Sequence, residues 1–272
     1  MHESETHGYE RQALAELQHW QHAMLREPGM LDRLATRWQS KVNGYIPERM
    51  HRAVTTVIKQ MTRGVLEGTH LVAPPPLASG DLQQREALVA EKIEVHRRMA
   101  AAEGGLTGAG GFLLGLADFP LLLGIKLKLL FEIAASYGYR GEGYQERIYI
   151  LRIMQLAFSS DAHRRSVYLQ MVDWDRQCTL LPSSLAEFEW REFQQEYRNY
   201  IDLAKLAQLL PIVGAPVGFV VNSQLLKKLG STAIQAYRMR WFERPALGPP
   251  ELTQVGLPQM LQTDAAPNSN QG

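Results

Sequence analysis

The chain of 272 residues contains a single cysteine, Cys178. One cysteine cannot form an internal disulfide, so the sequence is compatible with a reducing cytosol. A catalytic thiol would need a nearby base and an electropositive pocket, and nothing in the sequence indicates either, so we expect an idle thiol. The N-terminus is acidic and polar and has no basic region followed by an apolar run, which argues against a secretory signal.

The sequence also has little net charge and no long uncharged apolar run. Its formal net charge is +1, so no overall field attracts the protein to nucleic acid, and we expect no nucleic-acid partner. A membrane-spanning helix needs about 20 predominantly apolar residues. The nearest stretch, residues 104–125, contains Asp118 and is diluted by glycines, so it does not predict a membrane span.

The common catalytic and cofactor motifs are missing as well. The segment 105–111 is glycine-rich, but no strand precedes it and it lacks the Gly-Lys-Ser/Thr ending of a phosphate-binding loop. The chain has no Gly-x-Ser-x-Gly nucleophile elbow and no His-Glu-x-x-His zinc motif. His19 and His22 are three residues apart, but without further ligands they indicate an exposed pair. We therefore expect neither a cofactor nor a metal.

What the sequence does contain is helical periodicity along most of its length, which predicts an all-α protein. Pro74 to Pro76 mark a loop at 70–80, Asp81 is placed to cap the helix that follows, and Gly138 can end a helix in the left-handed conformation. We expect one helical domain over residues 1–245 and a disordered tail over 246–272. The domain would hold about nine helices, around residues 14–27, 31–43, 47–66, 81–102, 118–137, 144–158, 162–176, 184–206 and 223–244.

Two apolar segments interrupted by glycine and proline, residues 104–120 and 209–222, are the most distinctive parts of the chain. Small residues at helical spacing allow close helix packing, as in membrane proteins, although each glycine costs a helix about 1 kcal/mol relative to alanine. We expect each segment to form a kinked apolar hairpin that either packs inside the protein or contacts a membrane. Asp118 is interpreted as the N-cap of the next helix, with a buried ion-binding carboxylate as the alternative.

The last predicted helix is locally basic and carries a tryptophan. Basic residues beside an aromatic side chain suit an anionic membrane surface, and they equally suit an ordinary solvated helix face. The residues that would face a membrane are Lys227, Lys228, Arg238, Arg240, Trp241 and Arg244.

Polar residues near the glycine-rich core support a second hypothesis, a soluble enzyme of the hydrolase type. Glu146 and Arg147 open a helix, where an acidic residue suits the helix dipole and an internal salt bridge is the sharper interpretation. The candidate site residues are Asp118, Glu132, Tyr137, Glu146, Arg147 and Asn222. A third hypothesis is a soluble adaptor whose glycine segments pack in the core.

Three stretches of the chain together resemble the EcsC family. They are Ile46-Pro47-Glu48, the central run from Glu103-Gly104-Gly105 through Asp118-Phe119-Pro120 to Tyr137-Gly138-Tyr139, and Leu210-Pro211 followed by Val213-Gly214-Ala215 and Ala236-Tyr237-Arg238. The resemblance covers roughly residues 9–243. It implies no established activity, catalytic residues or cofactor, and the family's name implies a genetic association with an ABC transporter.

The leading expectation is therefore a non-enzymatic protein at the cytoplasmic face of the membrane. Its partner would be the membrane surface or a membrane protein, such as an ABC transporter. The sequence leaves its oligomeric state open.

Overall fold

The computed structural model describes residues 2–26, 56, 59–60, 62–65, 74–109, 119–159, 161–181 and 214–243. Regular structure in these residues is helical, which confirms the all-α prediction. The elements are α1 (His2–Leu25), α4 (Leu82–Ala109), α6 (Phe119–Ser136), α7 (Tyr144–Phe158), α8 (Asp161–Leu169), α9 (Trp174–Gln177), the short 3-10 helix η1 (Cys178–Leu180) and α11 (Gly214–Glu243).

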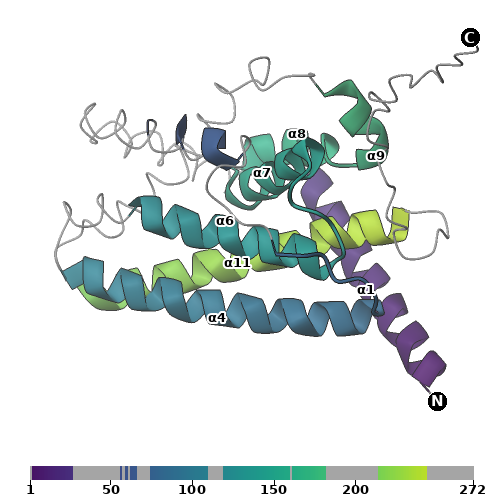
Figure 1. Ribbon diagram of the computed structural model, residues 1–272, viewed down its shortest axis with the longest axis horizontal. Helices are drawn as coiled ribbons and strands as arrows, with labels where there is room; N and C mark the ends of the chain where they lie inside the picture. Colours follow the sequence, from purple (N-terminus) through teal and green to yellow (C-terminus); the bar gives the residue numbers. More distant parts are fainter. Residues whose placement is uncertain are drawn as a thin grey trace, which may run out of the picture.

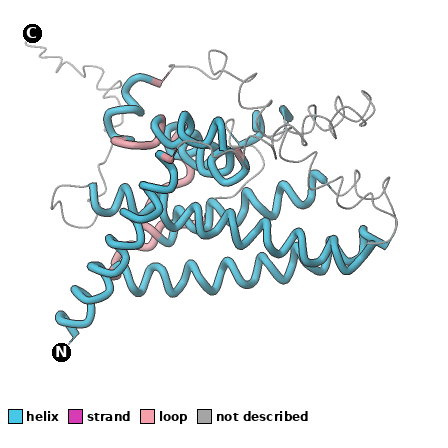
Figure 2. The backbone as a smooth tube through the Cα atoms, turned by 180° about the vertical axis from the view of Figure 1, so that it is seen from behind, coloured by secondary structure: helices cyan, strands magenta, loops and turns pink. Residues whose placement is uncertain are grey.

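Helix α11 is the centre of the described fold, because it packs against α1, α4, α6 and α7. It runs antiparallel to α4 along most of its length, as three contacts show: Glu86 meets Arg238, Ile93 meets Gly230 and Arg97 meets Ser223. Helix α6 lies beside this pair, α7 and α8 lie on the far side of α6 from α4, and α1 crosses the bundle obliquely (Figures 1 and 2). Distant parts of the chain therefore meet on α11.

The close approach of α4 and α11 depends on Gly230. A Cβ atom added at this position would lie 2.5 Å from Cδ1 and 2.6 Å from Cγ1 of Ile93. Distances under 3 Å are not tolerated between carbon atoms, so only glycine lets the Ile93 side chain rest against the backbone of α11. This contact fixes the spacing of the two longest helices.

The helix ends at Asp81 and Gly138 confirm the sequence prediction. The Oδ1 atom of Asp81 accepts a hydrogen bond of 2.8 Å from the backbone N–H of Gln84, which is the geometry of an N-cap. Gly138 has a φ of +89°. Its N–H and that of Tyr139 donate to the carbonyls of Ala135 and Ala134, so α6 ends in a Schellman motif.

The two glycine-rich segments differ from the prediction. Helix α4 does not stop near residue 102 but continues to Ala109, and α11 begins at Gly214, about nine residues before the predicted start at 223. Pro216 falls in the first turn of α11, where a missing N–H costs nothing. The long contact between α4 and α11 offsets the helix cost of the glycines. The described parts of both segments are therefore helix ends, and the expected hairpins are wrong there.

The antiparallel packing brings these two segments to one end of the bundle, where α4 ends and α6 and α11 begin (Figure 1). Residues 110–118, which include the predicted cap Asp118, lie outside the described residues. So do 209–213, the tail 246–272 and most of the helices predicted at 31–43, 47–66 and 184–206.

A second difference concerns the helix predicted over 162–176. Helix α8 ends at Leu169, and the chain turns before the short helix α9. Asp173 takes the left-handed conformation in this turn, with a φ of 52°, which a carboxylate side chain tolerates better than most. The turn carries Asp173 and Trp174 back toward the C-terminal end of α11.

Candidate functional site

A buried carboxylate, Glu86 of α4, gathers donors from three other parts of the chain. Arg238 of α11 makes two hydrogen bonds to it, from Nε to Oε1 at 2.7 Å and from Nη2 to Oε2 at 2.6 Å. The hydroxyls of Tyr9 and Tyr137 donate to the same two oxygens at 2.6 and 2.8 Å. The third guanidinium nitrogen of Arg238, Nη1, donates to Glu16 of α1 at 2.7 Å. We call these five residues the Glu86 centre.

A second buried carboxylate, Glu146 in the first turn of α7, is likewise bound by an arginine and a tyrosine. It accepts a bond of 2.6 Å from Nη1 of Arg240 and one of 2.7 Å from the hydroxyl of Tyr237. The Arg240 guanidinium carbon also lies 3.7 Å from the centroid of the Tyr139 ring and 4.8 Å from that of Tyr149. We call Glu146, Arg240, Tyr237, Tyr139 and Tyr149 the Glu146 centre. Glu146 therefore forms an internal salt bridge, the sharper of its two interpretations, with Arg240 as a partner that the sequence did not indicate.

Stacked tyrosines join the two centres. The rings of Tyr137 and Tyr237 lie 5.2 Å apart and nearly parallel, and one belongs to each centre. The Tyr149 ring packs 4.9 Å from that of Trp174, which extends the aromatic contact to α9. The Tyr149 hydroxyl donates to the Ala236 carbonyl at 2.7 Å. The polar groups of this end thus form one connected network around α11.

The tyrosines and arginines of the network keep their ordinary protonation states at neutral pH. Burial raises the pKa of Tyr137, Tyr149 and Tyr237 well above the usual value, and burial together with the Glu86 carboxylate raises the pKa of Tyr9 to about 12. Burial lowers the pKa of Arg238, but its bonds to Glu86 and Glu16 outweigh that effect and raise it overall. None of these groups is tuned toward pH 7, as a general acid or base would be.

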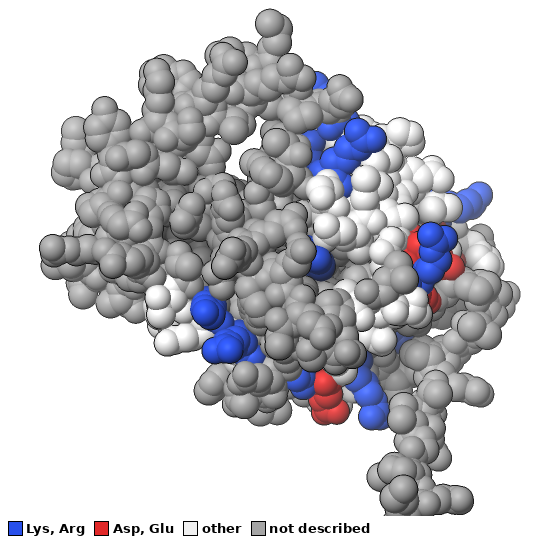
Figure 3. Space-filling model, turned by 90° about the horizontal axis from the view of Figure 1, so that it is seen from above, with Lys and Arg blue, Asp and Glu red and all other residues white. Residues whose placement is uncertain are grey.

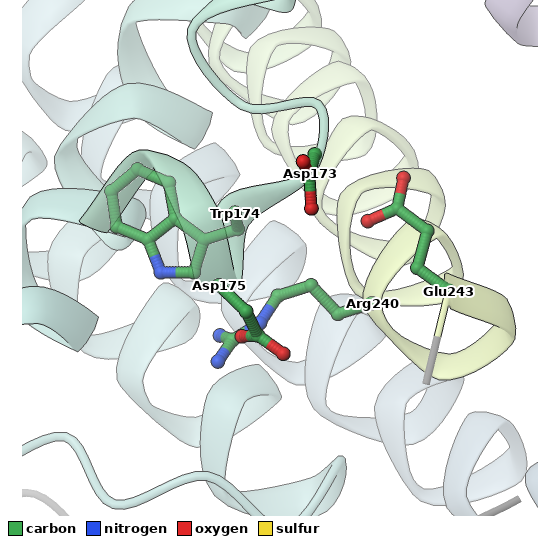
Figure 4. Close-up of a pocket in the computed structure, with 5 residues that line it drawn as sticks. All are labelled: Asp173, Trp174, Asp175, Arg240 and Glu243. Carbon is green, nitrogen blue, oxygen red and sulfur yellow. The ribbon is translucent and has the colours of Figure 1, made fainter. Parts of the chain in front are cut away.

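Beside the Glu146 centre lies a small acidic hollow. Asp173, Trp174, Asp175, Arg240 and Glu243 line a space of about 30 Å³, enough for only one or two water molecules. In Figure 4 the carboxylates of Asp173 and Glu243 face each other, while Arg240 extends toward Trp174 and Asp175. A cavity that binds a small-molecule substrate measures several hundred Å³, so this hollow does not suit one.

Glu243 is expected to destabilise the fold at neutral pH. Partial desolvation raises its pKa, a hydrogen bond with the Asp173 backbone offsets part of that rise, and the charges of Asp173 and Asp175 raise the pKa further, so the net direction is upward. The carboxylate also lies at the C-terminus of α11, where the helix dipole disfavours a negative charge. A raised carboxyl pKa means that the folded state binds the proton more tightly than the unfolded state, so the penalty grows as pH rises through the ordinary carboxyl range.

Glu243→Gln should therefore raise the midpoint of thermal unfolding at pH 7. The gain should shrink as pH falls and Glu243 becomes protonated in the parent protein. Melting curves of the two proteins between pH 4 and 8 test this, with Glu142→Gln as the control. A gain that is independent of pH would show that charge repulsion is not the cause.

Five of the six predicted site residues are described by the structure, and it does not bring these five together. Tyr137 and Glu146 belong to the two centres, whereas Glu132 lies apart on α6, 3.7 Å from Lys92 and 3.9 Å from His96. The Nε atom of Arg147 donates to the Gly141 carbonyl at 3.2 Å. Asn222 is buried on α11, and Asp118 lies outside the described residues. The members that can be placed serve in ion pairs, in a loop contact and in the core.

Some of the residues predicted to face a membrane are exposed, and others are buried. Lys227 and Lys228 are exposed. Arg238 and Arg240 are not, because Glu86 and Glu146 hold them inside the protein, so that part of the prediction is wrong. Trp241 is half-buried, with its indole N–H 3.4 Å from Glu10 and the Arg85 guanidinium over its ring. Arg244 lies outside the described residues.

The sequence interpretation missed Glu86, although helical phase offered a signal. Glu86 stands four residues after Leu82 and three before Val89, and both of these are fully buried. A carboxylate on the apolar face of a helix needs a buried partner. Cys178 matches its expected role, because burial raises the pKa of its thiol and leaves it less reactive. His19 and His22 are exposed, as predicted.

The described residues contain no group of three His, Cys, Asp or Glu side chains placed to hold a metal ion. Across the same part of the chain, none of the helices combines the length and apolar character needed to cross a membrane. The described residues thus form a helical protein with a central helix, α11. At one end of this helix, buried polar residues are bound to one another in one network.

The chain belongs to the EcsC protein family, which it matches over residues 11–242. It is 41% identical over 228 residues to protein EcsC of Bacillus subtilis, an alignment that covers 84% of this chain and 94% of that protein. It is also 31% identical over 153 residues to an uncharacterized protein of the same organism, YdbA, with 56% of each chain covered. No solved structure matches the chain.

Proposed function

We propose that this EcsC-family protein is a non-enzymatic helical protein that works at the cytoplasmic face of a membrane, on the lipid surface or on a membrane protein such as a transporter. The observation that carries the proposal is the basic and partly apolar character of one half of the bundle. We call this the glycine-rich half and define it as residues 95–109 of α4, 119–128 of α6 and 214–228 of α11.

Charge is distributed unevenly along the bundle. The glycine-rich half has one acidic residue, Glu103, against six basic residues: Arg97, Arg98, Lys126, Lys128, Lys227 and Lys228. Lys126 is buried, and Arg97 and Arg98 are bonded to the neighbouring Glu94. The basic surface of this half is therefore formed by Lys128, Lys227 and Lys228, which are exposed. The other half holds the carboxylates of both centres and those around the acidic hollow. Figure 3 shows one face of the molecule, on which Lys and Arg side chains are more prominent than Asp and Glu among the described residues. A one-sided basic surface suits the anionic cytoplasmic leaflet.

Apolar side chains are exposed in the same half. Leu121 in the first turn of α6 and Val220 near the start of α11 are each 54% exposed. Lys128 and Lys227 lie two turns further along the same helices, at positions seven residues away and therefore on the same helix faces. Exposed apolar residues followed by lysines can enter the headgroup region of a bilayer while the ammonium groups bind lipid phosphates.

The hydrolase alternative has less support. Tyr137 and Glu146 are bound within the two centres, and the acidic hollow is too small for a substrate. Glu243 has a raised pKa, but it lines only this small hollow and not a substrate-sized pocket, which an active site combines with a shifted pKa.

Vesicle flotation tests the proposal. The full chain should float with vesicles that contain phosphatidylglycerol and stay in the dense fraction with pure phosphatidylcholine. Lys128→Gln with Lys227→Gln should weaken binding by about 2 kcal/mol, roughly 30-fold, because each lysine near an anionic surface contributes about 1 kcal/mol.

The control is Arg11→Gln with Arg140→Gln, which removes the same charge from exposed positions outside the glycine-rich half. It should bind vesicles like the parent protein. A parent protein that does not float with anionic vesicles, or a control that loses binding equally, would contradict a lipid surface in the glycine-rich half.

A further inference from the structure

Helix α4 exposes a row of large apolar side chains on the face turned away from the core. Leu88, Val95 and Met99 are 40%, 48% and 46% exposed. Their spacing of seven and four residues places them on one stripe of the helix. Leu82, Val89 and Ala100, which are fully buried, lie about a third of a turn around the helix from this row. Helix α4 thus has two apolar faces. One is buried in the core, and the other is exposed.

The charges beside this row have mixed sign. Glu91 and Arg98 are both exposed and are seven residues apart, so they lie on the same flank of the row. Arg98 is bonded to Glu94 on its own helix at 3.1 Å, but its side chain is 78% exposed, and such a pair is weak and easily exchanged. Among the described residues Glu91 has no ion-pair partner. This mixture fits a protein surface better than an anionic lipid one.

We propose that the Leu88–Val95–Met99 row is the contact between two copies of this chain, packed with their α4 helices antiparallel about a two-fold axis. In an isologous contact each surface patch meets itself, so it must be complementary to its own rotated copy. An axis level with the midpoint of Glu91 and Arg98 satisfies this condition. Glu91 then lies opposite Arg98 of the second copy, and the reverse pair forms at the other end.

The same register aligns the apolar residues. The axis is level with a point halfway between residues 94 and 95. Val95 therefore lies almost level with the axis and contacts Val95 of the second copy. Met99 falls between Val95 and Leu88 of that copy, because a helix rises about 1.5 Å per residue and the three positions then alternate. Leu88 falls beside the small side chain of Ala102. One placement therefore satisfies both the charge pairs and the packing. It does not rest on the proposed membrane function, because it uses none of Leu121, Val220, Lys128 and Lys227.

Disulfide trapping tests the register. In a Cys178→Ser background, Val95→Cys should form a cross-linked dimer under mild oxidation. Leu88→Cys should not, because the two Leu88 positions would be about 20 Å apart along the helices. A mixture of Leu88→Cys and Ala102→Cys chains should cross-link again. If Leu88→Cys alone cross-links as fast as Val95→Cys, or if Val95→Cys stays monomeric, the proposal is overturned.

Charge exchange tests the same contact without cysteines. Glu91→Arg and Arg98→Glu each replace two attractive pairs per dimer by two repulsive ones, so each should raise the dimer dissociation constant roughly tenfold or more. The double variant Glu91→Arg/Arg98→Glu should restore it to within about threefold. Sedimentation equilibrium of the full chain measures these constants, and unchanged thermal melts confirm folding. A monomeric parent chain, or a double variant as weak as the singles, would overturn the proposal.

Discussion

Replacing Glu86 by glutamine should cost the fold about 3–5 kcal/mol of unfolding free energy, the range measured when one partner of a buried ion pair is removed. The side chain keeps its size, but its charge disappears while Arg238 stays buried with only 5% of its surface exposed. The amide also has one acceptor oxygen in place of the two that receive the bonds from Arg238, Tyr9 and Tyr137. Urea unfolding followed by circular dichroism measures the loss.

Two further variants isolate the cause. Glu86→Gln with Arg238→Met removes both charges and should recover part of the stability, because no unpaired charge remains buried. Glu16→Gln changes the other carboxylate that Arg238 binds, but Glu16 is 47% exposed, so it should cost about 1 kcal/mol or less. Equal losses for Glu86→Gln and Glu16→Gln would mean that burial does not determine the strength of this network.

Gly230→Val should destabilise the protein by about 3 kcal/mol, because overpacking a tight contact costs 1–3 kcal/mol or more. The new Cβ would collide with Cγ1 and Cδ1 of Ile93, and its two methyl groups leave little freedom to avoid them. Helices α4 and α11 would have to separate, which strains every contact between them. Chemical unfolding, with helical content checked by circular dichroism, measures the effect.

Removing the obstructing side chain should rescue this variant. Ile93→Ala with Gly230→Val exchanges volume across the same contact, so the double variant should be more stable than the sum of the single losses by at least about 1 kcal/mol. Gly8→Val is the matched control, since a Cβ at Gly8 meets nothing within 4 Å. It should change stability by less than about 0.5 kcal/mol. Additive losses in the double variant would show that Ile93 is not the obstacle.

The parts of the fold that local sequence predicts are those decided within one or two helical turns. Asp81 caps α4 through an atom three residues away, Gly138 and Tyr139 end α6 by donating to carbonyls three and five residues back, and α7 spans 144–158 as expected. Each of these depends on backbone groups close in sequence. Helix propensity and capping chemistry were therefore enough to place them.

The parts that could not be predicted depend on contacts across the chain. Glycines and Pro216 indicate broken helices locally, and only the packing of α4 against α11 carries both helices through those segments. Arg238 and Arg240 stand beside Trp241 in a basic stretch that suits a surface. The carboxylates that bury them are 152 and 94 residues earlier in the chain, a distance at which a single sequence offers no pairing signal.

Those separations also govern the order in which the protein can be completed. During synthesis Glu86 and Glu146 leave the ribosome well before Arg238 and Arg240, which bind them from the last described helix. Until α11 arrives, both carboxylates must stay hydrated, because an unpaired charge is not buried. The N-terminal helices can form early, but the core at this end closes only after translation has passed residue 240. In a chain released before that point, Glu86 and Glu146 would remain hydrated and the core at this end would not form. Such a truncated chain is expected to be sensitive to proteolysis.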